Sequence, residues 1–199
     1  MKGNKLKVVE IFQSVQGEGA NSGMWAIFIR LAGCNKDCDF CDADFNKGEY
    51  YTISEIKDII QCFDCKNIIW TGGEPTLQLT DEILSEFSDY YNCIETNGTN
   101  KVPEKIDYIA CSPKVSTEIL RTNFSHIHEI RYAVSEGDII PDVDDLPICD
   151  NYFLSPIFEG EEKIKADMSE KNIEYCLDQI RKNNRWRLSI QLHKILKIQ

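Results

Sequence analysis

Short apolar runs rich in Val, Ile and Phe recur along the chain, and helix-like segments lie between them. Apolar runs of this length, bounded by turn residues, predict buried strands. Strands are expected at LKVVEIF, AIFIRLA, NIIWT, NCIET, DYIACS, IHEIRYAV, NYFLSP and RLSIQ. The alternation of strands and helices is typical of an α/β fold in which helices cover a parallel sheet.

Three positions carry signals for the start of a helix. Thr52 with Glu55 forms a possible capping box before an amphipathic stretch, and Thr80 and Asp81 open a second stretch. Ser169 precedes a third. We therefore expect helices to begin directly after Thr52, Thr80 and Ser169.

Loops dense in Gly, Pro, Ser and Asn follow several of the expected strands: TGGEP, ETNGT, CSPK and LSP. In parallel α/β folds ligands gather at the carboxyl ends of the strands, where such loops converge. Too few strands are expected for a closed eightfold barrel of ordinary length. The pattern therefore favours a partial barrel with its chemistry at this end.

Composition narrows the class of protein. The 199 residues contain no repeat or linker, so we expect a single domain over residues 1–199. No apolar run is long enough for a membrane span or a signal peptide core, which favours a cytoplasmic location. The formal net charge of −11, without a basic stripe, argues against nucleic acid and membrane partners and for a small molecule.

The stretch CNKDCDFCDADF groups three of the nine cysteines, Cys34, Cys38 and Cys41, as C-x3-C-x2-C. A structural zinc site needs four protein ligands, and no fourth Cys or His lies nearby. A cubane iron-sulfur cluster held by three thiolates instead leaves one iron open to a ligand. Two alternatives remain: a zinc site completed by an aspartate, or three reduced thiols on a surface loop.

The loop TGGEP supports a ligand site. Gly72 and Gly73 allow the main chain to approach a ligand closely, and Glu74 and the loop carbonyls are acceptors suited to an ammonium group. Taken alone, the same residues could form a simple turn.

With the cysteine spacing, these residues resemble the radical S-adenosylmethionine (SAM) superfamily, in which the open iron of a 4Fe-4S cluster binds the amino and carboxylate groups of SAM. FQSVQGEG, FIRLAGCN, ETNGT, SPK and WRLSIQLHK narrow the resemblance to the 7-carboxy-7-deazaguanine synthase family of queuosine metabolism, from about residue 8 to the end. The resemblance implies a partial TIM-like barrel, flavodoxin or ferredoxin as reductant, and a homodimer.

The resemblance also implies three sets of site residues. The cluster ligands are Cys34, Cys38 and Cys41. The SAM site comprises Phe40, Asp42, Gly72, Gly73, Glu74, Ser112, Pro113, Lys114, Leu154, Ser155, Pro156 and Ile157. The substrate site comprises Val15, Gln16, Gly17, Glu18, Arg30, Thr71, His193 and the terminal carboxylate of Gln199. Arg30 could instead form an ordinary surface ion pair, and His193 could serve core packing.

Ala43 departs from the family pattern, which places Thr or Ser two residues after the third cluster cysteine to help bind magnesium. A methyl group offers no ligand to magnesium, which demands oxygen. Either Asp42 or Asp44 replaces the hydroxyl and the synthase reaction on 6-carboxy-tetrahydropterin is kept, or the metal is absent. We favour the second, a queuine lyase that releases 7-aminomethyl-7-deazaguanine for salvage; neutral drift at this position is the remaining explanation.

Two other functions fit parts of the sequence. One is an iron-sulfur redox sensor or electron carrier without catalysis, which would need neither the glycine loop nor a base pocket. The other is an activating enzyme that generates a glycyl radical on a protein partner. We further expect Cys62 and Cys65 to be buried or incidental thiols, Trp25, Trp70 and Trp186 to lie in the core, and residues 135–145 to form a solvated loop.

Overall fold

The computed structural model describes residues 5–38, 41, 45, 47–158 and 169–198. The strands among these residues join in one nine-stranded sheet of order β3-β1-β2-β4-β5-β6-β7-β8-β9. Its strands are β1 (Lys5–Val15), β2 (Trp25–Leu31), β3 (Glu49–Thr52), β4 (Asn67–Gly72), β5 (Tyr91–Thr96), β6 (Tyr108–Cys111), β7 (His126–Val134), β8 (Ile148–Pro156) and β9 (Trp186–Leu188). β1 is antiparallel to its two neighbours, β2 and β3. In the rest of the sheet, from β2 through β4 to β9, each strand is parallel to its neighbour.

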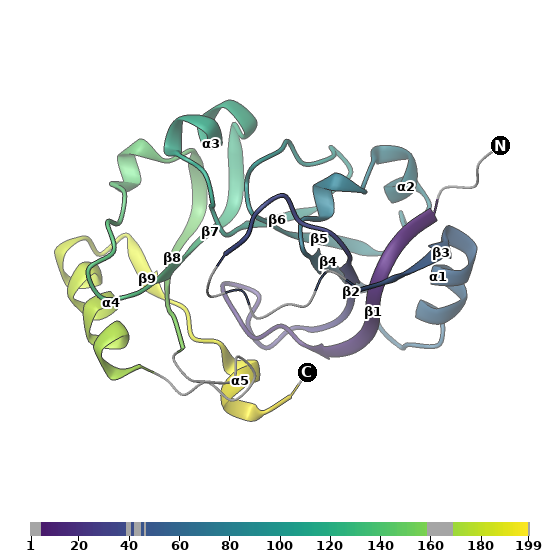
Figure 1. The fold of residues 1–199 in the computed structure, drawn as a ribbon, viewed down its shortest axis with the longest axis horizontal. Helices are drawn as coiled ribbons and strands as arrows, with labels where there is room; N and C mark the ends of the chain where they lie inside the picture. Colours follow the sequence, from purple (N-terminus) through teal and green to yellow (C-terminus); the bar gives the residue numbers. More distant parts are fainter. Residues whose placement is uncertain (1–4, 39–40, 42–44, 46, 159–168, 199) are drawn as a thin grey trace.

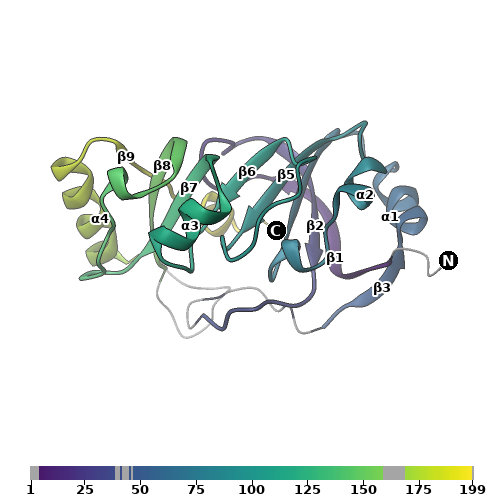
Figure 2. The same ribbon diagram turned by 90° about the horizontal axis from the view of Figure 1, so that it is seen from above.

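The sheet curves and stays open, with β3 and β9 at its two edges (Figure 1). The helices are α1 (Ile53–Ile60), α2 (Asp81–Ser85), α3 (Thr117–Asn123), α4 (Glu170–Lys182) and α5 (Leu192–Leu196), with 3-10 turns η1 (Pro75–Leu77) and η2 (Val143–Asp145). Helices α1 to α4 lie along the outer side of the curve, whereas α5 lies at the open side (Figures 1 and 2). The predicted α/β partial barrel is confirmed.

Each expected strand is present, and the helix starts are correct. Thr52 and Glu55 form a complete capping box, and Thr80 caps α2 through its side chain. Ser169 stands at the N-cap of α4, although its side chain makes no capping bond. The short elements β3, α3 and α5 were not predicted, because four to seven residues give too little periodicity to recognise.

Two hydrophobic clusters fill the space between the sheet and its outer helices. One is built around Trp70 and Phe87 and the other around Leu154 and Trp186. Trp25 differs from the expectation, since 49% of it is exposed at the start of β2. No helix among the described residues combines the length and the apolar character needed to cross a membrane.

Alternation along the strands turns a second set of side chains to the inner face. There Ala26, Ile69 and Cys93 form a small apolar cluster with Phe28 and Tyr108 packed against it. Residues two positions further along these strands point to the same face, and they carry polar side chains. The inner face therefore changes from apolar to charged toward the carboxyl ends of the strands, where the cavity described below opens.

Candidate active site

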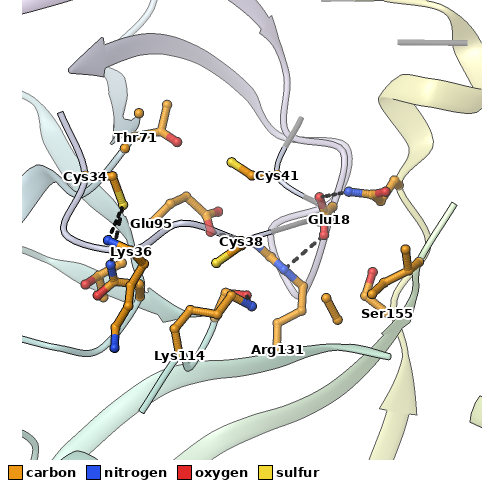
Figure 3. Close-up of a pocket in the computed structure, with 18 of the residues that line it drawn as sticks. Glu18, Cys34, Lys36, Cys38, Cys41, Thr71, Glu95, Lys114, Arg131 and Ser155 are labelled. Atoms are coloured by element: carbon orange, nitrogen blue, oxygen red, sulfur yellow. Dashed lines mark hydrogen bonds and ion pairs between the residues drawn. The ribbon is translucent and has the colours of Figure 1, made fainter. Parts of the chain in front are cut away.

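A cavity lies at the carboxyl ends of the parallel strands, on the inner side of the sheet (Figure 3). The predicted site residues that line it are Glu18, Arg30, Cys34, Cys38, Cys41, Thr71, Gly72, Gly73, Ser112, Lys114, Ser155, Pro156 and Ile157. The site residues that do not line it are Val15, Gln16, Gly17, Glu74, Pro113, Leu154 and His193. Phe40, Asp42, Ala43 and Gln199 lie outside the described residues.

The three grouped cysteines line this cavity together. Cys34 follows β2 after Ala32 and Gly33, and the amide of Cys41 donates a hydrogen bond to the carbonyl of Cys38 at 3.0 Å. All nine cysteines of the chain are described, and all are thiols rather than disulfide partners. Cys62 and Cys65, the tempting second pair, do not line the cavity, so the sulfur atoms gathered there come from the C-x3-C-x2-C loop.

The paired glycines after β4 allow two loops to touch. A Cβ atom on Gly73 would lie 2.0 Å from the carbonyl oxygen of Gly33 and 2.8 Å from the Cβ of Cys34. Gly72 has φ +134°, a conformation that side chains strongly disfavour. The TGGEP loop thus packs directly against the beginning of the cysteine loop, and its backbone borders the same cavity.

Glu74 has a different place from the one expected, because its carboxylate does not reach the cavity. The residue is fully buried. Its Oε1 accepts from the amide and hydroxyl of Thr76 and from the hydroxyl of Thr96, and its Oε2 accepts from the amide of Asn97 at 2.7 Å. The side chain joins the loops after β4 and β5, which leaves the backbone of this loop to meet a ligand.

The loop after β5 also supports the cysteine loop, a role that the sequence analysis missed. The side-chain amide of Asn97 donates to Cys34 Sγ at 3.9 Å and to Asn35 Oδ1 at 2.9 Å. Asn35 in turn donates to the hydroxyl of Thr99. Hydrogen bonds to ligand sulfurs orient them and tune a bound cluster. The ETNGT motif, which contains Asn97 and Thr99, is the sequence signal for this role, although from the sequence it supported only the family resemblance.

The electrostatics of the thiols test whether an iron-sulfur cluster fits. Burial raises the pKa of Cys38; nearby Lys114 lowers it, and Cys41 and Cys34 raise it again because three thiolates repel one another. Burial likewise lowers the pKa of Lys114, whereas the Cys38 thiolate raises it. Three thiolates at one wall of a cavity need more positive charge than one lysine supplies. The donor set fits a cationic cluster with three cysteine ligands.

Two carboxylates line the same cavity; below they are called its base end, and the three cysteines its cluster end. Glu18 lies in the loop after β1, and its Oε1 accepts from the side-chain amide of Gln191 at 2.9 Å. Glu95 on β5 accepts from the side-chain amide of Gln16 at 2.8 Å. Gln16 therefore contacts the cavity through Glu95 rather than lining it. Carboxylates accept hydrogen bonds from amine and lactam N–H groups, so this end can recognise a base.

Arg131 on β7 binds both of these carboxylates and was not predicted as a site residue. Its Nε lies 3.0 Å from Glu18 Oε2 and its Nη2 pairs with Glu95 (Figure 3). Its Nη1 pairs with buried Glu129 at 2.6 Å. Burial raises the pKa of Glu95 to about 7, although Arg131 lowers it. Arg131 lies within an apolar strand pattern, where the sequence shows no partner for it.

Arg30 and His193, two further residues of the expected substrate site, differ in whether they line the cavity. Arg30 lines the cavity and also forms an ion pair with Glu10 on the neighbouring strand, with Nε 2.7 Å from Oε1. His193 packs on the loop after β1, because a Cβ on Gly17 would lie 2.4 Å from its Nδ1. The amide of Leu192 donates to the carbonyl of Gly17 at 3.0 Å. The C-terminal segment therefore closes one side of the site.

Comparison with known proteins first places the class of protein. The family described as "Radical SAM superfamily" matches residues 28–116, which include the cysteine loop and the loops after β4, β5 and β6. The crystal structure of QueE from Escherichia coli matches with a TM-score of 0.66 and 24% identity, covering 95% of each chain. Residues 28–116 therefore match a radical SAM domain, and the chain as a whole shares the fold of this structure.

Curated relatives then place the family. The 7-carboxy-7-deazaguanine synthase of Bacteroides thetaiotaomicron is 36% identical over 194 residues, covering 96% of this chain and 98% of the relative. That of Haemophilus influenzae is 36% identical over 211 residues, covering 98% and 94%. The chain belongs to the 7-carboxy-7-deazaguanine synthase family. The relatives support the synthase alternative, and the queuine lyase that we favoured from Ala43 finds no support among them.

Proposed function

We propose that this protein is a radical SAM enzyme that converts 6-carboxy-tetrahydropterin to 7-carboxy-7-deazaguanine. One observation carries the proposal: a single cavity is lined by three thiols and by the Glu18 and Glu95 carboxylates. The names of the relatives, which match nearly the whole chain, support this reaction over the lyase.

Cys34, Cys38 and Cys41 would hold a 4Fe-4S cluster, leaving one iron for SAM. With SAM on the open iron, such a cluster would supply the one-electron radical chemistry needed to activate a C–H bond of the substrate. The backbone of Gly72 and Gly73, with Ser112, Lys114 and the residues from Ser155 to Ile157, would position SAM across the mouths of β4, β6 and β8. These residues bind, orient and exclude water, since no side-chain nucleophile is required.

Glu18 and Glu95 would recognise the substrate by accepting hydrogen bonds from it. A pterin and a 7-deazaguanine both carry an amine and a lactam N–H side by side, which match two carboxylate acceptors. Arg30 at the same cavity would take the substrate carboxylate with its planar fork of donors. A site built on such polar pairs discriminates strongly against bases without them, because its own buried groups would then be left unpaired.

The test is anaerobic turnover by the cluster-reconstituted enzyme with SAM and reductant. 6-Carboxy-tetrahydropterin and queuine are offered in parallel, and products are identified by mass. We expect 7-carboxy-7-deazaguanine from the pterin. The Cys38→Ala variant should give none and serves as the negative control. If wild type produces 5'-deoxyadenosine and 7-aminomethyl-7-deazaguanine from queuine while the pterin is returned unchanged, the synthase proposal is wrong.

One sequence observation favours the queuine lyase as a second candidate. Ala43 stands where the family carries a hydroxyl residue for magnesium, and a methyl group cannot ligate that ion. Ala43→Thr separates the two candidates. A synthase that manages with Asp42 or Asp44 should gain magnesium stimulation from the new hydroxyl, whereas a lyase should be indifferent to magnesium before and after the change. The reductant, flavodoxin or ferredoxin, and the homodimer stay predictions of the family resemblance.

A further inference from the structure

Arg131 is the centre of a buried network of charged residues at the base end of the cavity. Only 9% of its side chain is exposed, and its three nitrogens each pair with a different carboxylate, from Glu18, Glu95 and Glu129. These partners come from three separate segments: the loop after β1, the end of β5, and β7 itself. A planar guanidinium can bind three carboxylates in fixed directions, which a lysine ammonium cannot reproduce.

Glu129 also joins this network to the loop after β1. It is 1% exposed, and its Oε2 accepts from the amide of Ala20 at 2.8 Å and from the hydroxyl of Tyr108 at 3.1 Å. A Cβ on Gly19 would lie 1.9 Å from its Oε1, so the loop that carries Glu18 rests directly on this carboxylate. The position of Glu18 is therefore set by Arg131 on one side and by Glu129 through the loop backbone.

We propose that Arg131 is the positioning residue of the base pocket: it holds the Glu18 and Glu95 carboxylates next to each other and facing the cavity, so that they accept two adjacent N–H groups of the substrate. The substrate part of this inference rests on the proposed function. The arrangement of the three carboxylates around one guanidinium stands on the geometry alone.

The charges at Glu95 explain why an arginine is needed. Burial, with the charges of Glu129 and Glu18, outweighs the lowering by Arg131 and raises the pKa of Glu95 to about 7. The other titratable groups whose charge couples to it are Cys93 on its own strand and Tyr108 and Cys111 on β6, all with raised pKa. Without Arg131 the pKa of Glu95 would lie higher still, so the carboxyl would stay protonated at neutral pH, lose an acceptor and fail to recognise two donors.

The test compares Arg131→Gln and Arg131→Lys with Arg187→Gln in the reconstituted holoenzyme. Arg187 is a matched control, since it lies on β9, donates to Asn151 and does not line the cavity. We expect Arg131→Gln to raise KM about 100-fold with a much smaller change in kcat, and to move the acid limb of kcat/KM upward by about one pH unit. Arg187→Gln should change neither.

Arg131→Lys separates positioning from charge. Because lysine keeps the positive charge, the acid limb should return to within about half a unit of wild type, whereas KM should stay about 10-fold raised because one ammonium cannot hold both carboxylates. An Arg131→Gln enzyme with wild-type KM and an unmoved acid limb would overturn the inference. So would a uniform fall in kcat for both variants, which is the signature of a merely structural role.

A second measurement does not depend on the reaction. In protein labelled with 13C at the glutamate carboxyls, the Glu95 signal is assigned by its loss in Glu95→Gln and then titrated. We expect a midpoint near neutral pH in wild type and a higher midpoint in Arg131→Gln; if that variant does not fold, Arg131→Lys should keep the wild-type midpoint. Equal midpoints in wild type and Arg131→Gln overturn the electrostatic part. If neither substrate is turned over, the proposed function fails while this titration still decides the role of Arg131.

Discussion

Negative charge is neutralised in different ways at the two ends of the cavity. At the cluster end, Cys34, Cys38 and Cys41 come from one short loop, and Lys114 is the cation coupled to Cys38 among the described residues. At the base end, Glu18, Glu95 and Glu129 surround Arg131, which the chain itself supplies. The cluster end thus needs a cationic cofactor to complete it, whereas the base end is largely complete within the protein.

This difference implies different responses to mutation and to pH. A site completed by a cofactor should fail as a unit when one ligand is lost, because a cluster is bound or is not. A site completed by a network of ion pairs should lose function in steps, as each partner is removed. Four predictions test this contrast, from the largest expected effect to the smallest.

Cys38→Ala should abolish activity and reduce the iron bound after anaerobic reconstitution to a small fraction of the wild-type content, since three thiolates are the minimum that hold a cubane cluster. Iron analysis and the visible absorbance of the cluster measure how much cluster is bound. Cys62→Ala, which removes an exposed thiol, is the control and should retain full iron. A Cys38→Ala protein with a full cluster would remove the basis for the contrast.

Glu74→Gln should lower the free energy of unfolding by about 3 kcal/mol. An amide in place of the carboxylate turns a donor toward groups that themselves donate, and buried hydrogen bonds to a charged group contribute about 1.5–3 kcal/mol each. Urea unfolding of the apoprotein checks this, with exposed Glu104→Gln as the control. A change below 1 kcal/mol would show that the loops after β4 and β5 do not depend on this carboxylate.

Glu95→Gln should become relatively more stable as the pH rises. The folded pKa of Glu95, about 7, lies above the ordinary value of 4.5 for a glutamate, so its contribution is fully present below pH 4.5 and is lost as the pH rises through 7. Wild type should therefore lose about 2 kcal/mol from this group between pH 5 and pH 8, a loss absent in the variant. Denaturant unfolding at the two pH values measures it; a pH-independent difference would contradict the raised pKa.

Gln191→Ala should have the smallest effect of the four. It removes one hydrogen bond to Glu18, which Arg131 still holds. Loss of a single bond to a partly exposed carboxylate costs about 1 kcal/mol, which predicts a roughly fivefold rise in substrate KM. Steady-state kinetics on the active substrate check this. A loss as large as that of Arg131→Gln would mean that the C-terminal segment, rather than β7, sets the position of Glu18.

The cluster end could be predicted because its signals are local. Cys34 to Cys41 span eight positions, and Gly72 and Gly73 are adjacent, so spacing alone indicates a shared ligand. The base end could not, because Glu18, Glu95 and Arg131 lie far apart along the chain and each looks ordinary in its own segment. Glu74 shows the converse limit: its motif was noticed, but the direction of its carboxylate depends on Thr96 and Asn97 of another strand.

The sequence by itself determined the α/β class, the starts of the main helices and the three thiols, because these depend on residues within a few positions of one another. The tertiary structure alone decided which carboxylates meet, which arginine neutralises them and which side of the cavity the C-terminal segment closes. Parallel strands bring residues together by register across the sheet, and register depends on packing over the whole fold rather than on any single segment.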